Sequence, residues 1–203
     1  MNTLRRLGRL AVTSMALLLI AGGACASASE LYKYTSPGPS DTLGVGTPIK
    51  VSMLAGWSMH SEETSGWATD TCTAWAMEGT LKSAGGEASH PIVGLSSSNI
   101  SGCVNATKFL KPGELEIRYV GSGTEGDLYL KNAEMTYVDT TLGIDCIVKI
   151  ETATQIGRLT GAKSGSATLY LGWWLPEVGL CSDKRVVGTL SVTSPTGLIV
   201  EAK

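Results

Sequence analysis

Apolar and polar residues alternate along much of the chain, with a period of two. The clearest stretch is 114–119, where leucine, isoleucine and tyrosine alternate with two glutamates and an arginine. The segment 49–53 follows the same rule, with isoleucine, valine and methionine at every second position. Because successive side chains of a strand point to opposite faces, such stretches predict strands with one buried face. Beyond the N-terminal segment, no stretch has the 3.6-residue period of an amphipathic helix.

Clusters of glycine, proline and serine divide the chain into about nine or ten short strands, at intervals of roughly 10 to 15 residues. With 25 glycines and no helical pattern, the sequence predicts an all-β fold, an antiparallel β-sandwich or barrel. We expect an extended lead-in over 29–46 and a single domain over 47–203. One interpretation of this domain is that it consists of two similar halves, about 47–120 and 128–203, each closed by a disulfide. The segment 60–66, with two glutamates, predicts an exposed loop.

The first 28 residues have the pattern of a secretory signal peptide. Three arginines lie within the first nine residues, an apolar run covers 10–20, and small residues cover 21–29. Such a leader is removed on export, so we exclude 1–28 from the fold. No other apolar stretch reaches the ~20 residues of a transmembrane helix. We therefore expect a bacterial protein that is secreted, periplasmic or part of the cell envelope.

Two Ala-x-Ala sites predict that the mature chain begins at Ser27 or Ser29. The alternative is a lipoprotein, in which Cys25 is acylated and anchors the chain to a membrane. Gly22 stands where the lipoprotein pattern has a bulky aliphatic residue, and this favours simple cleavage.

Removal of the leader makes the chain more acidic. The full sequence has 16 basic and 18 acidic residues; without the three leader arginines, 13 basic residues remain and the formal charge is about −5. No run of lysine or arginine is interleaved with aromatic residues. Nucleic acid is therefore not an expected partner.

Export to an oxidising compartment allows disulfide bonds to form. Once the leader is removed, four cysteines remain, at Cys72, Cys103, Cys146 and Cys181. Four cysteines allow three pairings. The similar separations of 31 and 35 residues favour Cys72 with Cys103 and Cys146 with Cys181. By the loop-entropy argument, each bond would stabilise the fold by roughly 3 to 4 kcal/mol.

Glycine, cysteine and turn residues recur in a set order. A cysteine strand covers 141–146, a Gly-x-Leu-Thr-Gly step covers 157–161, and a Gly-x-x-x-Val-Thr-x-Pro segment covers 188–195. The front of the chain is similar at 46–49 and 101–103. These motifs resemble those of a loosely defined set of uncharacterised secreted bacterial all-β proteins with paired cysteines. The resemblance covers most of the mature chain and implies export and a β fold, but no catalytic residue.

The segment 167–175, which contains two adjacent tryptophans, provides the strongest binding hypothesis. As a strand, it directs Tyr170, Gly172 and Trp174 to one face, and Trp173 with aliphatic residues to the other. Two aromatic rings on either side of a glycine leave room for a sugar ring, whose C–H face stacks on aromatic surfaces. Tyr170, Trp173 and Trp174 are therefore candidate ligand-binding residues for a polysaccharide, with polar contacts from 183–185. The alternative is that these rings pack beneath a loop, since aromatic residues are common in strands for packing alone.

Catalytic patterns are weaker. His60 and His90 lack the spacing of a zinc site, and the cysteines are better used as disulfides, so neither a metal nor another cofactor is expected. No Gly-x-Ser-x-Gly motif is present, although a histidine and a distant serine can meet in an all-β fold. Glu114 and Glu116 share a strand face, which would place their carboxyl groups about 7 Å apart, within the range of the two catalytic carboxyl groups of inverting glycosidases. Acidic residues on a solvated strand face are the commoner explanation.

Taken together, these patterns predict a secreted, non-catalytic β-rich module with an envelope, surface or extracellular interaction role. A carbohydrate-binding protein is the first alternative, and a secreted hydrolase with an all-β fold is the second.

Overall fold

The computed structural model describes residues 28–34, 41–63, 68–86, 89–105, 107–121, 123–139, 143–174 and 184–202. The described residues form strands and turns without a helix, so the predicted all-β class is confirmed. In particular, they include no helix suited to crossing a membrane. Residues 1–27 of the predicted leader, with Cys25, lie outside the described residues, as does Cys181.

Fifteen strands are present in the described part of the chain, more than the nine or ten expected. Several are short segments that lack a clear alternating pattern. The strands are β1 (Ser29–Lys33), β2 (Asp41–Thr42), β3 (Pro48–Met53), β4 (Met59–Glu63), β5 (Ala68–Gly86), β6 (Ser89–Cys103), β7 (Lys108–Lys111), β8 (Glu114–Tyr119), β9 (Glu125–Lys131), β10 (Ala133–Asp139), β11 (Ile144–Ile150), β12 (Thr154–Thr160), β13 (Thr168–Trp174), β14 (Lys184–Ser194) and β15 (Leu198–Ala202).

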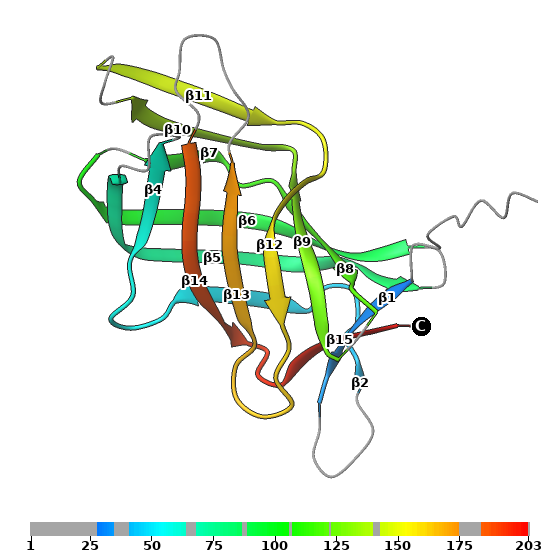
Figure 1. Ribbon diagram of the computed structural model, residues 1–203. Coiled ribbons are helices and arrows are strands. Elements are labelled where there is room, and N and C mark those ends of the chain that lie inside the picture. Colours follow the sequence, from blue (N-terminus) through cyan, green and yellow to red (C-terminus); the bar gives the residue numbers. More distant parts are fainter. Residues whose placement is uncertain are drawn as a thin grey trace, which may run out of the picture.

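Eight of these strands close into an antiparallel barrel (Figure 1). Neighbours pair in the order β5–β3–β14–β13–β12–β9–β8–β6, and β6 pairs back to β5. Closure gives each of the eight strands a partner on both sides, which is how a barrel avoids exposed sheet edges. The strands come from both predicted halves of the chain, which join through the β3–β14 and β8–β9 pairs.

β4 lies in the barrel wall between β5 and β14, the same two strands that flank β3. β3 pairs with 76–80 of β5 and 190–194 of β14, whereas β4 pairs with 68–72 of β5 and 184–187 of β14. A turn between them contains Gly56, whose φ of 80° suits glycine. The expectation of a loop over 60–66 is therefore wrong for 60–63, because backbone pairing with β5 and β14 makes this segment a strand.

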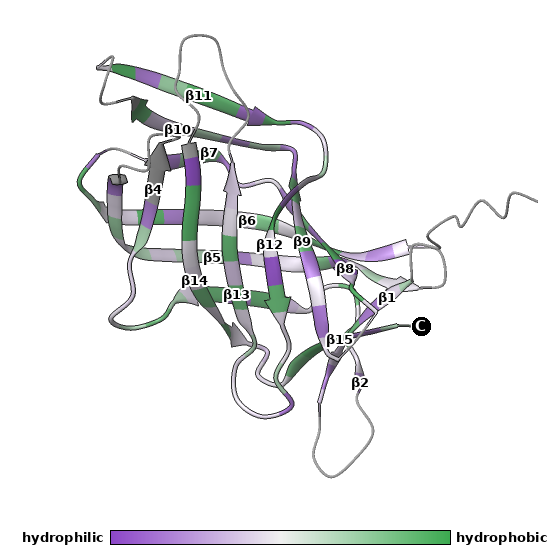
Figure 2. Cartoon of the chain, in the orientation of Figure 1, coloured by the Kyte–Doolittle hydropathy of each residue, from purple (hydrophilic) through white to green (hydrophobic). Residues whose placement is uncertain are grey.

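The barrel interior is the hydrophobic core. Hydrophilic and hydrophobic residues alternate along the strands of the wall (Figure 2), and the apolar set is buried. The largest fully buried aliphatic side chains from the barrel strands are Leu81, Leu128, Leu130, Leu159 and Leu190. Two tryptophans of opposite walls also meet here, with the Trp75 and Trp173 ring centroids 6.5 Å apart.

A second sheet of β7, β10 and β11 lies across one end of the barrel, at the top of Figure 1. Its inner face is apolar and buried, with Met135, Tyr137 and Val148 almost fully covered. Phe109 of β7 stacks on Trp75 with the ring centroids 5.9 Å apart. This sheet therefore extends the core of the barrel instead of forming a separate unit.

A disulfide and a buried aspartate hold the same junction near this end. Cys72 of β5 and Cys103 of β6 lie directly opposite each other and form the first predicted disulfide. Two residues before Cys72, the buried Asp70 carboxylate accepts hydrogen bonds from the backbone N–H of Asn105 at 2.8 Å and the hydroxyl of Thr107 at 2.7 Å. Cys146 is also disulfide-bonded, but its predicted partner lies outside the described residues.

The predicted lead-in over 29–46 takes part in the fold. β1 pairs with the C-terminal strand β15 along its whole length, and it also contacts β2 and the end of β5. Ser29 is fully buried, and its hydroxyl donates a hydrogen bond to the carbonyl of Ile117 at 3.0 Å. The beginning and end of the described chain therefore lie side by side at the edge of the barrel (Figure 1).

Candidate functional site

The aromatic strand of the binding hypothesis is β13, part of the barrel wall. It pairs with β14 without a bulge, from Thr168 opposite Ser191 to Trp174 opposite Arg185. Regular pairing preserves the period of two, so its side chains alternate strictly between the core and the outer surface.

The outer face of β13 carries two large exposed rings. Tyr170 is 53% exposed and Trp174 is 49% exposed, with the exposed Gly172 between them. Trp173 faces the core instead and is only 4% exposed. Its Nε1–H is buried with no hydrogen-bond partner among the described residues. Of the three candidate ligand-binding residues, the structure thus brings Tyr170 and Trp174 together on one surface and places Trp173 beneath it.

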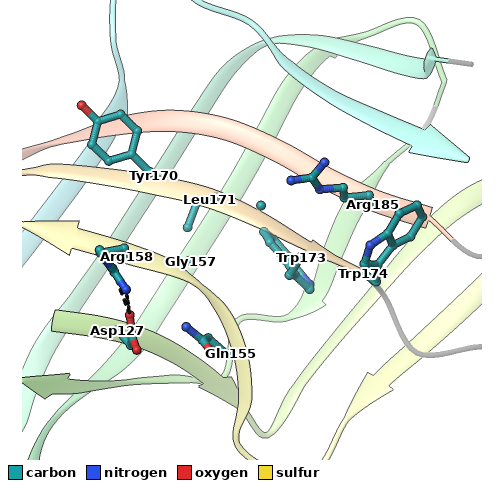
Figure 3. A pocket seen from close by; sticks show the side chains of 10 residues that line it. Asp127, Gln155, Gly157, Arg158, Tyr170, Leu171, Trp173, Trp174 and Arg185 are labelled. Atoms are coloured by element: carbon teal, nitrogen blue, oxygen red, sulfur yellow. Dashed lines mark hydrogen bonds and ion pairs between the residues drawn. The ribbon is translucent and has the colours of Figure 1, made fainter. Parts of the chain in front are cut away.

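An open groove of about 530 Å³ runs across this surface (Figure 3). We call it the β13 groove. Figure 3 shows Tyr170 and Trp174 near opposite ends of β13, with Arg185 on one side and the side chains of β9 and β12 on the other. The groove is lined by Asp127, Gln155, Gly157, Arg158, Tyr170, Leu171, Gly172, Trp173, Trp174 and Arg185.

A β-bulge in β12 shapes one side of the groove. The register with β9 shifts between Gln155 and Gly157, so one extra residue is accommodated in β12. As a result, Gln155 and Arg158 are both exposed although they are three positions apart, while Ile156 is buried. In a regular strand, positions separated by three residues would face opposite sides.

Gly157 is needed for the close approach of β12 and β13. A Cβ atom at this position would lie 2.1 Å from the carbonyl oxygen of Tyr170 and 3.0 Å from the Cα of Leu171. Any larger residue would push the two strands apart directly beneath the groove. The glycine of the Gly-x-Leu step is thus explained by packing between strands.

Arg158 and Asp127 form an ion pair at the groove. Nε and Nη2 of Arg158 each lie 3.1 Å from Oδ1 of Asp127, and Nη1 lies 3.6 Å from a carboxylate oxygen of Glu125. The pair places N–H donors beside carboxylate acceptors, and this suits a ligand rich in hydroxyl groups, each of which both donates and accepts.

The floor between the two aromatic rings is open. In the part of the chain that the structure describes, and apart from its chain neighbours, a Cβ atom built on Gly172 would meet only Nη2 of Arg185, at an ordinary contact distance of 3.5 Å. Arg185 was one of three residues expected to supply polar contacts, and it lines the groove. Lys184 lies in β14, but its side chain is not among those described, and Asp183 lies outside the described residues.

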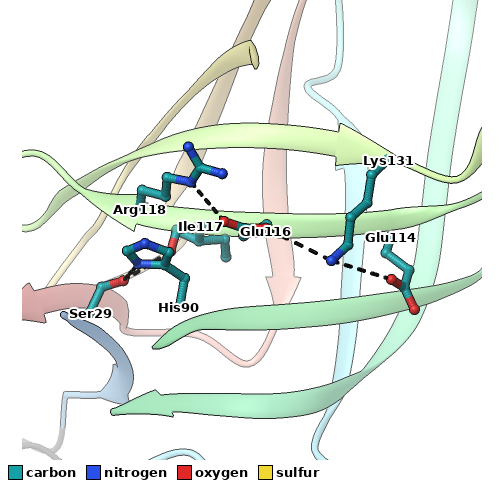
Figure 4. Close-up of polar contacts among 7 residues, drawn as sticks. All are labelled: Ser29, His90, Glu114, Glu116, Ile117, Arg118 and Lys131. Atoms are coloured by element: carbon teal, nitrogen blue, oxygen red, sulfur yellow. Dashed lines mark hydrogen bonds and ion pairs between the residues drawn. The ribbon is translucent and has the colours of Figure 1, made fainter. Parts of the chain in front are cut away.

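The two glutamates of the hydrolase hypothesis lie on the outer face of β8, and both are neutralised by cations (Figure 4). Glu114 pairs with Lys82 at 2.7 Å and with Lys131 at 3.7 Å; Glu116 pairs with Arg118 at 2.7 Å and with Lys131 at 3.8 Å. The hydrogen bond from Lys82 lowers the pKa of Glu114, aided by the charge of Lys131. A general acid needs a raised pKa, so this environment opposes that role.

A serine and a histidine also meet, but not in a catalytic arrangement. The Ser29 hydroxyl lies 2.9 Å from Nδ1 of His90 (Figure 4). Since it donates its proton to the Ile117 carbonyl, it accepts from the histidine. A nucleophilic serine must instead donate to the histidine and face the substrate, whereas this hydroxyl is fully buried. This contact connects β1 to the barrel.

Among the described residues, the possible metal ligands that cluster are Asp70, Cys72 and Cys103. Both sulfurs are used in the disulfide, so this cluster is not a metal site. The fold and the site therefore define a closed antiparallel β-barrel with an aromatic groove on its outer wall. No known protein family, curated protein or solved structure matches the chain.

Proposed function

We propose that this chain is a non-catalytic carbohydrate-binding protein, exported to the cell envelope or the extracellular space. The observation that supports this most strongly is the pair of half-exposed rings, Tyr170 and Trp174, on one face of β13. The pattern of the leader supports export. The ion pair of Arg158 with Asp127 supplies polar contacts to hydroxyl groups beside the rings.

The exposed aromatic area supplies one part of the free energy of a weak binding site. An aromatic side chain has roughly 150–250 Å² to bury, so two half-exposed rings offer about 200 Å² to a ligand. At ~25 cal/mol per Å², covering this area would contribute about 5 kcal/mol. Association and ordering of side chains cost a similar amount, so the polar contacts must provide the remainder. We therefore expect dissociation constants in the micromolar to millimolar range.

Binding can be tested with the exported protein and a panel of insoluble and soluble polysaccharides. A ligand that covers Trp174 should shift tryptophan emission to shorter wavelength and retard the protein in gels that contain the polysaccharide. Trp174→Ala should abolish both effects without changing the far-ultraviolet circular dichroism.

The matched control is Trp57→Ala, because Trp57 is similarly exposed at 53% but does not line the groove. This variant should bind as the wild type does. Equal binding by the wild type and Trp174→Ala would refute the proposed site, and absence of binding to every polysaccharide would refute the proposed function.

A further inference from the structure

We infer that the ligand of the β13 groove is an extended, uncharged glycan of the β-1,4-linked type, at least three sugar rings long. This inference rests on the proposed function and adds the length, shape and charge of the ligand. Three features of the groove carry it: the separation of the two aromatic rings, the open floor between them, and the distribution of charge along one side.

The separation of the rings sets the length of the ligand. Tyr170 and Trp174 are four positions apart on a strand, which corresponds to about 13 Å at 3.2–3.4 Å per residue. One sugar ring is much shorter than this span and reaches one aromatic ring only. A chain that stacks on both rings must therefore bridge the space above Gly172 with at least one further sugar.

The regularity of β13 sets the shape. Its pairing with β14 contains no bulge from Thr168 to Trp174, so Tyr170 and Trp174 project from the same face of one uninterrupted extended strand. β-1,4-linked pyranoses form an extended ribbon with flat faces, whereas α-1,4-linked chains coil. The extended ribbon is therefore the chain that contacts both rings at once.

The open floor provides the central position. At Gly172, the Arg185 guanidinium is the only group of the described residues, chain neighbours aside, within 4 Å of where a Cβ atom would be. A sugar ring above this glycine approaches the backbone closely, and the Arg158–Asp127 pair and Gln155 lie along one side of the groove to contact its hydroxyl groups.

The charges at this side favour an uncharged sugar. Arg158 is already shared between the carboxylates of Asp127 and Glu125, at distances of 3.1 and 3.6 Å. A uronic acid placed here would bring a third carboxylate towards this pair. Neutral hydroxyl groups instead use the donors and acceptors without such repulsion.

The first test is isothermal titration calorimetry of the wild type with cello-oligosaccharides and chito-oligosaccharides from one to six sugars. Affinity for at least one series should rise by tenfold or more between the monosaccharide and the tetrasaccharide and then level off. Maltohexaose and hexagalacturonate should bind at least tenfold more weakly than the preferred hexasaccharide.

The second test uses Gly172→Val, which fills the floor between the rings. Valine is favourable in strands and has space here, so the unfolding midpoint should stay within about 3 °C of the wild type. Binding of the preferred hexasaccharide should fall at least tenfold. Gly44→Val is the matched control, because a Cβ atom on Gly44 would likewise meet no close contact among the described residues, and Gly44 does not line the groove.

The outcomes separate the two proposals. A monosaccharide that binds as tightly as the hexasaccharide, a preference for the α-linked or acidic chain, or unimpaired binding by Gly172→Val would each overturn this inference while the carbohydrate-binding function stands. Failure of every carbohydrate, polymers included, to bind the wild type would overturn both.

Discussion

Replacement of Asp70 by alanine tests how the barrel is held to the segment that follows β6. The Asp70 carboxylate is only 3% exposed and accepts hydrogen bonds from the Asn105 backbone N–H and the Thr107 hydroxyl. A hydrogen bond to a charged group contributes roughly 1.5–3 kcal/mol. Because neighbouring bonds are not fully additive, we expect Asp70→Ala to lower the free energy of unfolding by about 3 to 5 kcal/mol.

Urea unfolding of the oxidised protein, followed by circular dichroism, measures this change. With a typical slope of ~2 kcal/mol per molar urea, the midpoint should fall by roughly 2 M while the slope stays constant. Thr107→Val removes one of the two hydrogen bonds and keeps the side-chain shape, so it should cost about half as much. A loss below ~1 kcal/mol for Asp70→Ala would show that these hydrogen bonds do not hold the junction.

Three further predictions concern stability and processing. Replacing both Cys72 and Cys103 by alanine should lower the free energy of unfolding by about 4 kcal/mol, from the entropy of a 31-residue loop, and a loss below ~1 kcal/mol in urea unfolding would contradict this. Lys82 lowers the pKa of Glu114, so the ionised carboxylate stabilises the fold above its usual pKa of 4.5, and this stabilisation is lost as the pH falls through the folded pKa. The Lys82→Met variant should therefore have a lower melting temperature than the wild type at pH 7, and the difference should vanish in strong acid. Because Ser29 is fully buried, the exported protein should begin upstream of it, and an intact mass with Ser29 first would refute this, since a charged amino group would then be buried.

Strands with a strict apolar–polar alternation were predictable from the sequence. The segment 114–119 forms β8, and 49–53 lies within β3. These strands have one face in the core and one in solvent, so burial itself imposes the pattern. β4 was not predictable in this way, because it is a strand only by virtue of backbone hydrogen bonds to β5 and β14, which are distant in the sequence.

The same distinction applies to the candidate site. The alternation along one strand was enough to place Tyr170 and Trp174 on a common face and Trp173 opposite to them. It was not enough to find Gln155 and Arg158, because the bulge in β12 breaks the period of two at the point where these side chains enter the groove. Gly157 was the one local indication of this bulge, since a glycine in a strand often marks a bulge or a close backbone approach.

The sequence by itself determined the β class and the placement of Tyr170 and Trp174 on one face of a strand, because side-chain alternation is a local property. The exposure of that face and the pairing of Cys72 with Cys103 were decided by the tertiary structure. The tertiary structure alone decided that β9 and β12 lie beside β13, that Asp127 faces Arg158, and that Ser29 is buried between distant strands. These arrangements depend on which strand edges pair when the barrel closes. Backbone hydrogen bonds between edges are almost independent of side-chain identity, so their choice of partner leaves little trace in the sequence.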